Sequence, residues 1–110
     1  MLRRIIGNMG PTMLRKGKTM HPGRVLREEY MDPMRIDTDG LAAALGVSAG
    51  RLEPIIAREE PVTSDLALRL AKCFHTSPQF WLGLQTAYDL SMAHAMFGAE
   101  IEAHVRELAA

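Results

Sequence analysis

The stretch from Thr38 to Ile55, TDGLAAALGVSAGRLEPI, decides the fold of this chain. Thr38 is a residue type that caps helix N-termini, and Asp39 behind it complements the helix dipole. Gly46 stands where a left-handed backbone often ends a helix. Between them, apolar side chains recur at i, i+1 and i+4: Leu41, Ala42 and Leu45. The pattern predicts a short helix with one face in a core.

A second short helix follows after a tight turn. Ser48 is a suitable N-cap, and Val47 before it can pack back over the turn. The next apolar residues lie at i, i+3 and i+4: Leu52, Ile55 and Ile56. Ala42 is small enough for the two helices to approach closely. Two helices joined by about three or four residues that include glycine are typical of a helix-turn-helix, which favours DNA binding. A two-helix hairpin without that function would share the apolar spacing.

The composition favours one small all-α domain. The chain has 110 residues, of which 47% are hydrophobic and 5% aromatic. This is enough for a single core without disulfides, and the only cysteine, Cys73, suits a core position in a reducing cytoplasm. No apolar run approaches the roughly 18 residues of a membrane span, and no secretory signal is visible. We therefore expect a soluble cytoplasmic protein without a membrane partner.

Charge is distributed unevenly although the net charge is zero. Residues 1–19 hold five basic side chains and no acidic one, whereas residues 20–110 hold eight basic and thirteen acidic side chains. Attraction to DNA would then come from a local basic patch, from a dimer's combined surface or from the N-terminal segment. We predict that residues 1–19 form a basic flexible arm. A misassigned leader before Met13 or Met20, an organellar transit peptide and an arm that enters a DNA groove are the alternatives.

Three further helices are predicted around the hairpin. The first begins near Pro22 and ends before Pro33, because the residue before a proline is pushed out of the helical region. The second is capped by Thr63 and ends near His75, and the third opens with Ser77 and Pro78. Their expected core residues are Val25, Leu26, Tyr30, Leu66, Leu70, Phe74, Phe80, Trp81, Leu84 and Tyr88.

The end of the chain is predicted to form a separate helix. Gly98 interrupts the apolar stripe that runs on through Met92 and Met96. Beyond it, Glu102 and Arg106 are spaced to pair on the exposed side. Apolar residues recur there at i, i+4 and i+7: Ile101, Val105 and Leu108. We expect residues 97–110 to cover the domain's own core or to form a dimer contact.

With these residues in place, the chain resembles the HigA-type, or VapI-type, antitoxins of the Xre/Cro-repressor-like family. The resemblance runs from about His21 to Leu90 and is carried by HPGRVLREEYMDPM, LAAALGVSAGRL and VTSDLALRLAKCFHTSPQFWLGLQTAYDL. It implies an all-α, five-helix lambda-repressor-like domain over residues 20–96 with a C-terminal helical extension. It also implies a homodimer that binds a palindromic operator in its own promoter and forms a complex with a cognate toxin, usually an mRNA-cleaving ribonuclease.

The resemblance places the recognition helix from Ser48 onward. Arg51 is the best single candidate for reading a base, since arginine makes bidentate contacts to guanine, and Glu53 can accept from a cytosine amine. Ser48 and Thr38 are candidates for phosphate contacts. The full predicted DNA-binding set is Thr38, Ser48, Ala49, Gly50, Arg51, Glu53 and Arg58.

Three features depart from a typical reading helix. Pro54 lies inside it and should shorten or bend it. Glu59 and Glu60 follow in a loop where carboxylates repel phosphate, while Ala49 and Gly50 offer almost no side-chain hydrogen bonding. The alternative function is therefore a protein-interaction module of the same fold that has lost specific DNA binding.

Enzymatic chemistry finds little support in the sequence. Cys73 and His75 are two residues apart and would face different directions on a helix. Glu100 and His104 are spaced to share a metal, but only His94 lies near enough to add a third ligand. We predict no catalytic site, no metal site and no cofactor.

Overall fold

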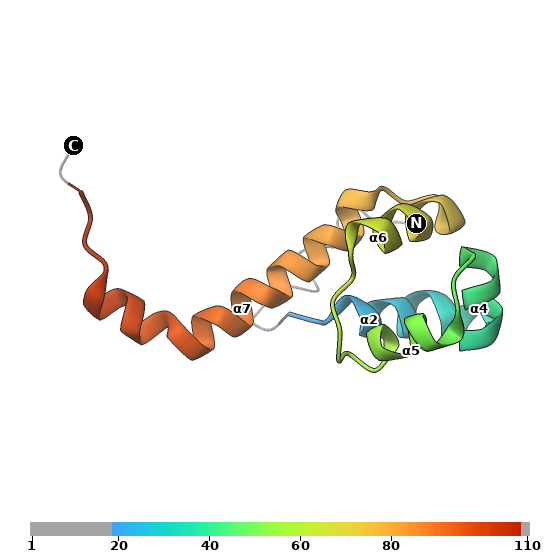
Figure 1. Cartoon of the computed structure of the whole chain (residues 1–110), viewed down its shortest axis with the longest axis horizontal. Helices are drawn as coiled ribbons and strands as arrows, with labels where there is room; N and C mark the ends of the chain where they lie inside the picture. Colours follow the sequence, from blue (N-terminus) through green and yellow to red (C-terminus); the bar gives the residue numbers. More distant parts are fainter. Residues whose placement is uncertain (1–18, 109–110) are drawn as a thin grey trace.

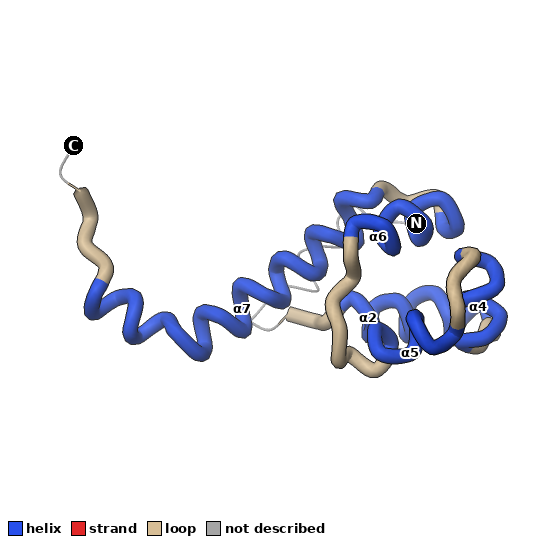
Figure 2. The backbone as a smooth tube through the Cα atoms, viewed as in Figure 1, coloured by secondary structure: helices blue, strands red, loops and turns tan. Residues whose placement is uncertain are grey.

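The computed structural model describes residues 19–108, which contain helices and no strands (Figures 1 and 2). The predicted all-α fold is confirmed. The first helical segment is continuous but changes type along its length, as α2 (Pro22–Val25), the π-helix η2 (Leu26–Met31) and α3 (Asp32–Met34). Four further helices follow: α4 (Thr38–Leu45), α5 (Ala49–Ile56), α6 (Ser64–Phe74) and α7 (Pro78–His104). The arm predicted over residues 1–19 lies outside the described residues except for Thr19.

The first helical segment does not end before Pro33, so that prediction was wrong. Proline lacks an N–H group and its ring presses on the carbonyl four residues back. The chain enters Pro33 from a π-helical turn, in which the N–H of Asp32 donates to the carbonyl of Arg27, five residues earlier. The hydrogen bonds to the fifth residue back, in place of the fourth, make room for the ring of Pro33. The helix ends at Met34, and Arg35 after it has a left-handed backbone with φ 55°.

The hairpin of α4 and α5 follows the predicted pattern with one correction. Asp37, not Thr38, caps α4: its Oδ1 atom accepts from the N–H of Gly40 at 2.8 Å, and Thr38 is the first helical residue. Asp37 and Thr38 are both good caps, and Asp37 is the one with extended backbone. Gly46 ends α4 with φ 74°, and Ser48 caps α5 by accepting from the N–H of Arg51 at 3.2 Å. These last two predictions are confirmed.

The core lies where the first helical segment, α4, α5, α6 and the start of α7 meet. Its largest fully buried apolar side chains come from all of these elements: Leu26, Leu41, Leu52, Leu66, Leu70 and Trp81. Helices α2 and α5 approach very closely, because a Cβ atom at Gly23 would stand only 1.9 Å from the carbonyl oxygen of Ile55. Gly23 is therefore required for this packing.

Helices α6 and α7 pack on each other and begin with the caps that the sequence predicts. Thr63 accepts from the N–H of Leu66 at 3.3 Å, and Ser77 from that of Phe80 at 3.0 Å. Buried Gln85 joins α7 to the preceding loop, because its Oε1 accepts from the N–H of Val62 at 2.8 Å. A buried polar side chain with its hydrogen bonds made fixes the loop without the cost of an unsatisfied group.

Helix α7 is one continuous helix of 27 residues, so the predicted interruption at Gly98 was wrong. An interior glycine costs a helix about 1 kcal/mol but does not by itself end it. The helix stops at His104; Val105 is extended, and Leu108 is 94% exposed. These two residues therefore do not share a helical face with Ile101, and the ion pairs among residues 19–108 do not join Glu102 to Arg106.

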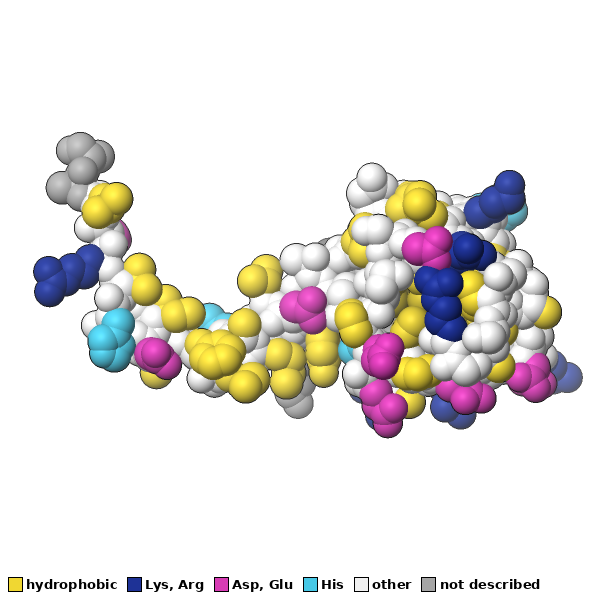
Figure 3. Space-filling view, viewed as in Figure 1, with side chains coloured by type: hydrophobic (Ala, Val, Ile, Leu, Met, Phe, Trp, Pro, Cys, Tyr) yellow, Lys and Arg dark blue, Asp and Glu magenta, His cyan; other side chains and the backbone are white. Residues whose placement is uncertain are grey.

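The second half of α7 projects away from the core (Figure 1). The described part of the chain measures 52 × 31 × 24 Å along its principal axes. Gln85 is the last buried residue of α7, and the projecting half carries exposed apolar side chains (Figure 3): Leu90, Met92, Met96, Phe97 and Ile101. Within residues 19–108, no helix is both long and apolar enough to cross a membrane.

Candidate nucleic-acid interface

The first turn of α5 presents a small polar surface to solvent. Ser48, Gly50, Arg51 and Glu53 are all exposed, whereas Ala49 is half-buried and packs against the core. The unpaired N–H groups of a helix N-terminus favour anionic groups such as phosphate. The structure thus brings together the four exposed residues that the sequence analysis assigned to the start of the reading helix.

Pro54 lies inside α5, which nevertheless continues to Ile56 and is eight residues long. Pro54 has no N–H to donate to the carbonyl of Gly50. Gly50 is exposed, so water can satisfy that carbonyl. A Cβ atom at Gly50 would meet nothing within 4 Å. The helix therefore tolerates Pro54, because the carbonyl that the proline leaves without a donor is exposed to water at Gly50.

Arg51 does not stand alone, because it pairs with Asp65 in the first turn of α6. One carboxylate oxygen of Asp65, Oδ2, accepts from Nη2 of Arg51 and also from Nε of Arg69, the latter at 3.0 Å. The hydrogen bond from Arg51, followed by that from Arg69, holds the pKa of the Asp65 carboxyl below its usual value. Asp65 therefore remains ionised at neutral pH and bridges two guanidinium groups.

Arg69 ties this pair to the turn of the helix-turn-helix. Its Nη1 donates to the carbonyl oxygens of Leu45, at 2.8 Å, and Gly46, at 3.3 Å. These carbonyls belong to the C-terminal turn of α4, where the helix leaves acceptors without intrahelical donors. Arg69 thus links α6 to the end of α4, while Asp65 links α6 to the start of α5.

Asp65 and Arg69 were not among the predicted site residues. Their spacing of four residues on one helix is a visible sign of an ion pair between them. The bond from Asp65 to Arg51 spans 14 residues, and no local pattern indicates it. The contact between Arg51 and Asp65 can be recognised only when the tertiary structure shows α5 and α6 side by side.

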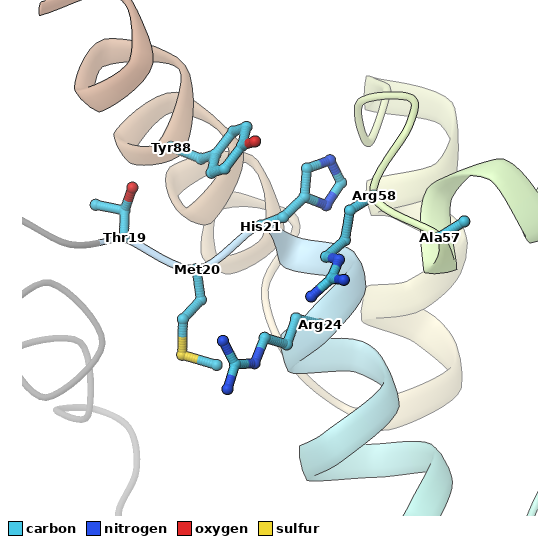
Figure 4. Close-up of a pocket in the computed structure, with 7 residues that line it drawn as sticks. All are labelled: Thr19, Met20, His21, Arg24, Ala57, Arg58 and Tyr88. Atoms are coloured by element: carbon cyan, nitrogen blue, oxygen red, sulfur yellow. The ribbon is translucent and has the colours of Figure 1, made fainter. Parts of the chain in front are cut away.

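Arg58 lies at the other end of α5 from Arg51. It follows the C-terminus of α5 with a left-handed backbone, φ 65°, and faces a surface pocket that also includes His21, Arg24 and Tyr88 (Figure 4). An eight-residue helix is about 12 Å long, so the structure does not bring Arg58 together with the first turn of α5. Its predicted role in DNA binding remains a prediction.

His21 caps the first helical segment inside this pocket. Its Nδ1 accepts from the N–H of Gly23 at 2.9 Å, and its ring packs edge-on to Tyr88 with centroids 5.0 Å apart. Burial, the largest influence, lowers the pKa of His21. The imidazole is therefore neutral at neutral pH and acts as a hydrogen-bond acceptor in the packing of α2 on α7.

The remaining charges form no broad basic field on the face seen in Figure 3, where acidic and basic side chains are interspersed over the globular part. Glu59 and Glu60 are exposed in the loop after α5. Thr38 is half-buried in the first turn of α4. On this face the surface around the hairpin is therefore not strongly positive, and the basic groups nearest the first turn of α5 are Arg51 and Arg69.

The residues weighed for other chemistry do not converge. Cys73 is half-buried in α6, where burial raises the pKa of its thiol, and His75 ends that helix with a left-handed backbone. The Nδ1 atom of His104 lies 3.0 Å from the backbone carbonyl oxygen of Glu100, not from its carboxylate. Among residues 19–108, no three His, Cys, Asp or Glu side chains are grouped so that they could hold a metal ion.

Two short capped helices, α4 and α5, are joined by the turn from Gly46 to Ser48 inside a five-helix bundle. This arrangement defines a helix-turn-helix protein of the Xre/Cro-repressor-like class. No protein-family model matches the sequence. Virulence-associated protein I of Dichelobacter nodosus is 49% identical over 74 residues, which cover 67% of this chain and 68% of that protein. Antitoxin HigA-1 of Vibrio cholerae is 33% identical over 75 residues, which cover 68% of this chain and 70% of that protein.

A solved structure of Pseudomonas aeruginosa antitoxin HigA with the higBA promoter superposes with a TM-score of 0.79 and 39% identity, and the match covers 82% of this chain and 98% of that protein. The chain belongs to the HigA-type, or VapI-type, antitoxin family of helix-turn-helix proteins. The resemblance stated from the sequence is confirmed.

Proposed function

We propose that this chain is a DNA-binding antitoxin that represses its own promoter and neutralises a cognate toxin, an mRNA-cleaving ribonuclease, by forming a complex with it. The HigA relative with its promoter DNA supports the operator-binding part of the proposal, and the antitoxin names of the relatives support the toxin-binding part. The chain acts in the cytoplasm, where its operator lies. It carries out no catalysis in this role.

The exposed first turn of α5 is the observation that carries the proposal. It places Arg51 at the surface beside the free N–H groups of the helix N-terminus. In this arrangement Arg51 reads a guanine through two N–H groups, while Ser48 and the helix N-terminus hold a phosphate. Glu53, two residues further along α5 and also exposed, accepts from a cytosine amine.

The projecting half of α7 supports a homodimer. Leu90, Phe97 and Ile101 lie at i, i+7 and i+11, which places them on one side of the helix, and they are 65%, 48% and 51% exposed. A helix face this apolar is stable in water when another apolar face covers it. A second copy of α7 supplies such a face, and the two-fold axis then presents two copies of Arg51 about 34 Å apart on successive turns of a palindromic operator.

Sedimentation equilibrium tests the dimer. Phe97→Asp should shift the protein to a monomer, because a carboxylate would be buried in the interface. Ala99→Asp is the matched control: it adds the same charge to the same exposed stretch of α7, on the opposite side of the helix from Phe97. If Phe97→Asp remains as dimeric as the control, this face of α7 is not the interface.

A salt-dependent binding titration against the chain's own upstream promoter DNA tests operator recognition. Arg51→Ala should abolish the preference for that DNA over scrambled DNA, whereas Arg106→Ala, a matched loss of charge beyond the end of α7, should not. Growth rescue on co-expression with a candidate cognate toxin tests neutralisation. Rescue without any DNA binding, even at low salt, would favour the alternative, a protein-interaction module that has lost its operator.

A further inference from the structure

We propose that Asp65 is a positioning residue that aims Arg51 at its base and thereby sets the discrimination between operator and other DNA. The inference rests on the proposed operator binding and extends it to a residue on another helix. Asp65 is on α6, outside the reading helix, yet its carboxylate bonds directly to the side chain of Arg51.

The position of Asp65 is itself fixed. Its Oδ2 atom accepts from Nε of Arg69 at 3.0 Å, and Nη1 of Arg69 donates to the carbonyl of Leu45 at 2.8 Å. This chain of contacts runs from the end of α4 through Arg69 and Asp65 to Arg51. The guanidinium of Arg51 is therefore held against the frame of the helix-turn-helix, although its side chain is 44% exposed.

Arg51 keeps donors available for DNA in this position. A guanidinium carries five N–H groups in one plane, and within residues 19–108 only Nη2 of Arg51 is bonded, to Asp65. The remaining donors suffice for a bidentate contact to guanine. Because the long side chain is already confined, less conformational entropy is lost when it meets the base.

The negative charge of Asp65 also favours discrimination between operator and other DNA. A carboxylate at the surface repels the phosphate backbone and so weakens binding to DNA of any sequence. It also opposes a shift of Arg51 from the base edge to a phosphate. Asp65 thus strengthens the operator complex by positioning Arg51 and weakens the competing complexes by charge.

Two substitutions at Asp65 separate positioning from charge. Asp65→Asn should raise the affinity for scrambled DNA and lower the ratio of operator to scrambled affinity by about tenfold, which is the discrimination of one bidentate base contact. Asp65→Glu keeps the charge but moves the carboxylate. It should lower the ratio while leaving the affinity for scrambled DNA unchanged. Asp39→Asn, which removes an exposed carboxylate from the first turn of α4, is the matched control and should leave the base preference intact.

The readout is a panel of operators, each with one base pair changed. Wild type should show a guanine preference at one position that is lost in Arg51→Ala, in Asp65→Asn and in their double mutant to the same extent, because the two residues act as one unit. If Asp65→Asn keeps that preference and behaves like Asp39→Asn, the inference is wrong while the proposed function stands. A wild type without any operator preference would overturn both.

Discussion

Replacement of Gly23 by alanine is expected to destabilise the protein, because α2 and α5 leave no room for a side chain between them. A Cβ atom at this position would lie 1.9 Å from the carbonyl oxygen of Ile55 and 2.9 Å from its carbonyl carbon. Ordinary contact begins near 3.4 Å. The obstacle is backbone and not the end of a flexible side chain, so the two helices must move apart.

The size of the effect follows from three terms. Overpacking of this kind costs about 1–3 kcal/mol. Displacement of Ile55 also weakens the hydrogen bond that its carbonyl accepts from the N–H of Arg58 at 3.0 Å, worth about 1 kcal/mol. Alanine in place of glycine returns up to about 1 kcal/mol of helix propensity. We expect a net loss of about 2 kcal/mol in the free energy of unfolding, or a Tm lower by roughly 10 °C.

Urea unfolding at a fixed protein concentration measures this loss, with the fluorescence of the buried Trp81 as the signal. Gly83→Ala is the matched control. Gly83 is inside α7, and a Cβ there would meet nothing within 4 Å, so this variant should be more stable than wild type by up to about 1 kcal/mol. If Gly23→Ala unfolds at the same urea concentration as wild type or a higher one, the close approach of α2 and α5 does not hold in solution.

Three further predictions concern a side chain, a pH dependence and a loop. Arg69→Met should lower the unfolding free energy by about 1–2 kcal/mol in the same urea assay, because the carbonyl of Leu45 loses a charged donor; a variant as stable as wild type would show that the link to α4 contributes nothing. Burial lowers the pKa of His21, so the unfolded chain binds a proton more readily, and stability should fall as the pH drops below about 6.5. His21→Asn keeps a capping acceptor, and thermal melts at pH 7 and pH 5.5 should differ less for it than for wild type; an equal pH dependence would exclude His21 as the source. Lysine at both Glu59 and Glu60 should strengthen operator binding and steepen its salt dependence, and unchanged titrations would place this loop away from the DNA.

Local signals in the sequence predicted most of the fold. Ser48, Thr63 and Ser77 act through bonds to the third residue after them, and Gly46 through its own backbone, so each is readable without knowledge of the rest of the chain. The errors arose where a residue that usually ends a helix is tolerated inside one. Pro33 fits a helix once a π-turn precedes it, and Gly98 costs its helix too little to end it.

The candidate nucleic-acid interface could also be predicted only in part, because one of its contacts depends on the tertiary fold. The exposure of Ser48, Gly50 and Arg51 follows from the amphipathic pattern of α5. The partner of Arg51 does not, because Asp65 is brought to it by the packing of α6 across the hairpin. Such a contact depends on the tertiary fold, and two residues far apart in the chain give no periodic sign of it.

The open space over Gly50 bears on how such a protein can change its target. A side chain introduced there would extend from the reading helix into solvent and would disturb no buried neighbour. Gly50 is one position before Arg51, so in the proposed operator complex a side chain there would be within reach of the next base pair along the groove. New sequence preferences can therefore arise by a single substitution, through evolution or by design, while the residues that hold the domain together remain as they are.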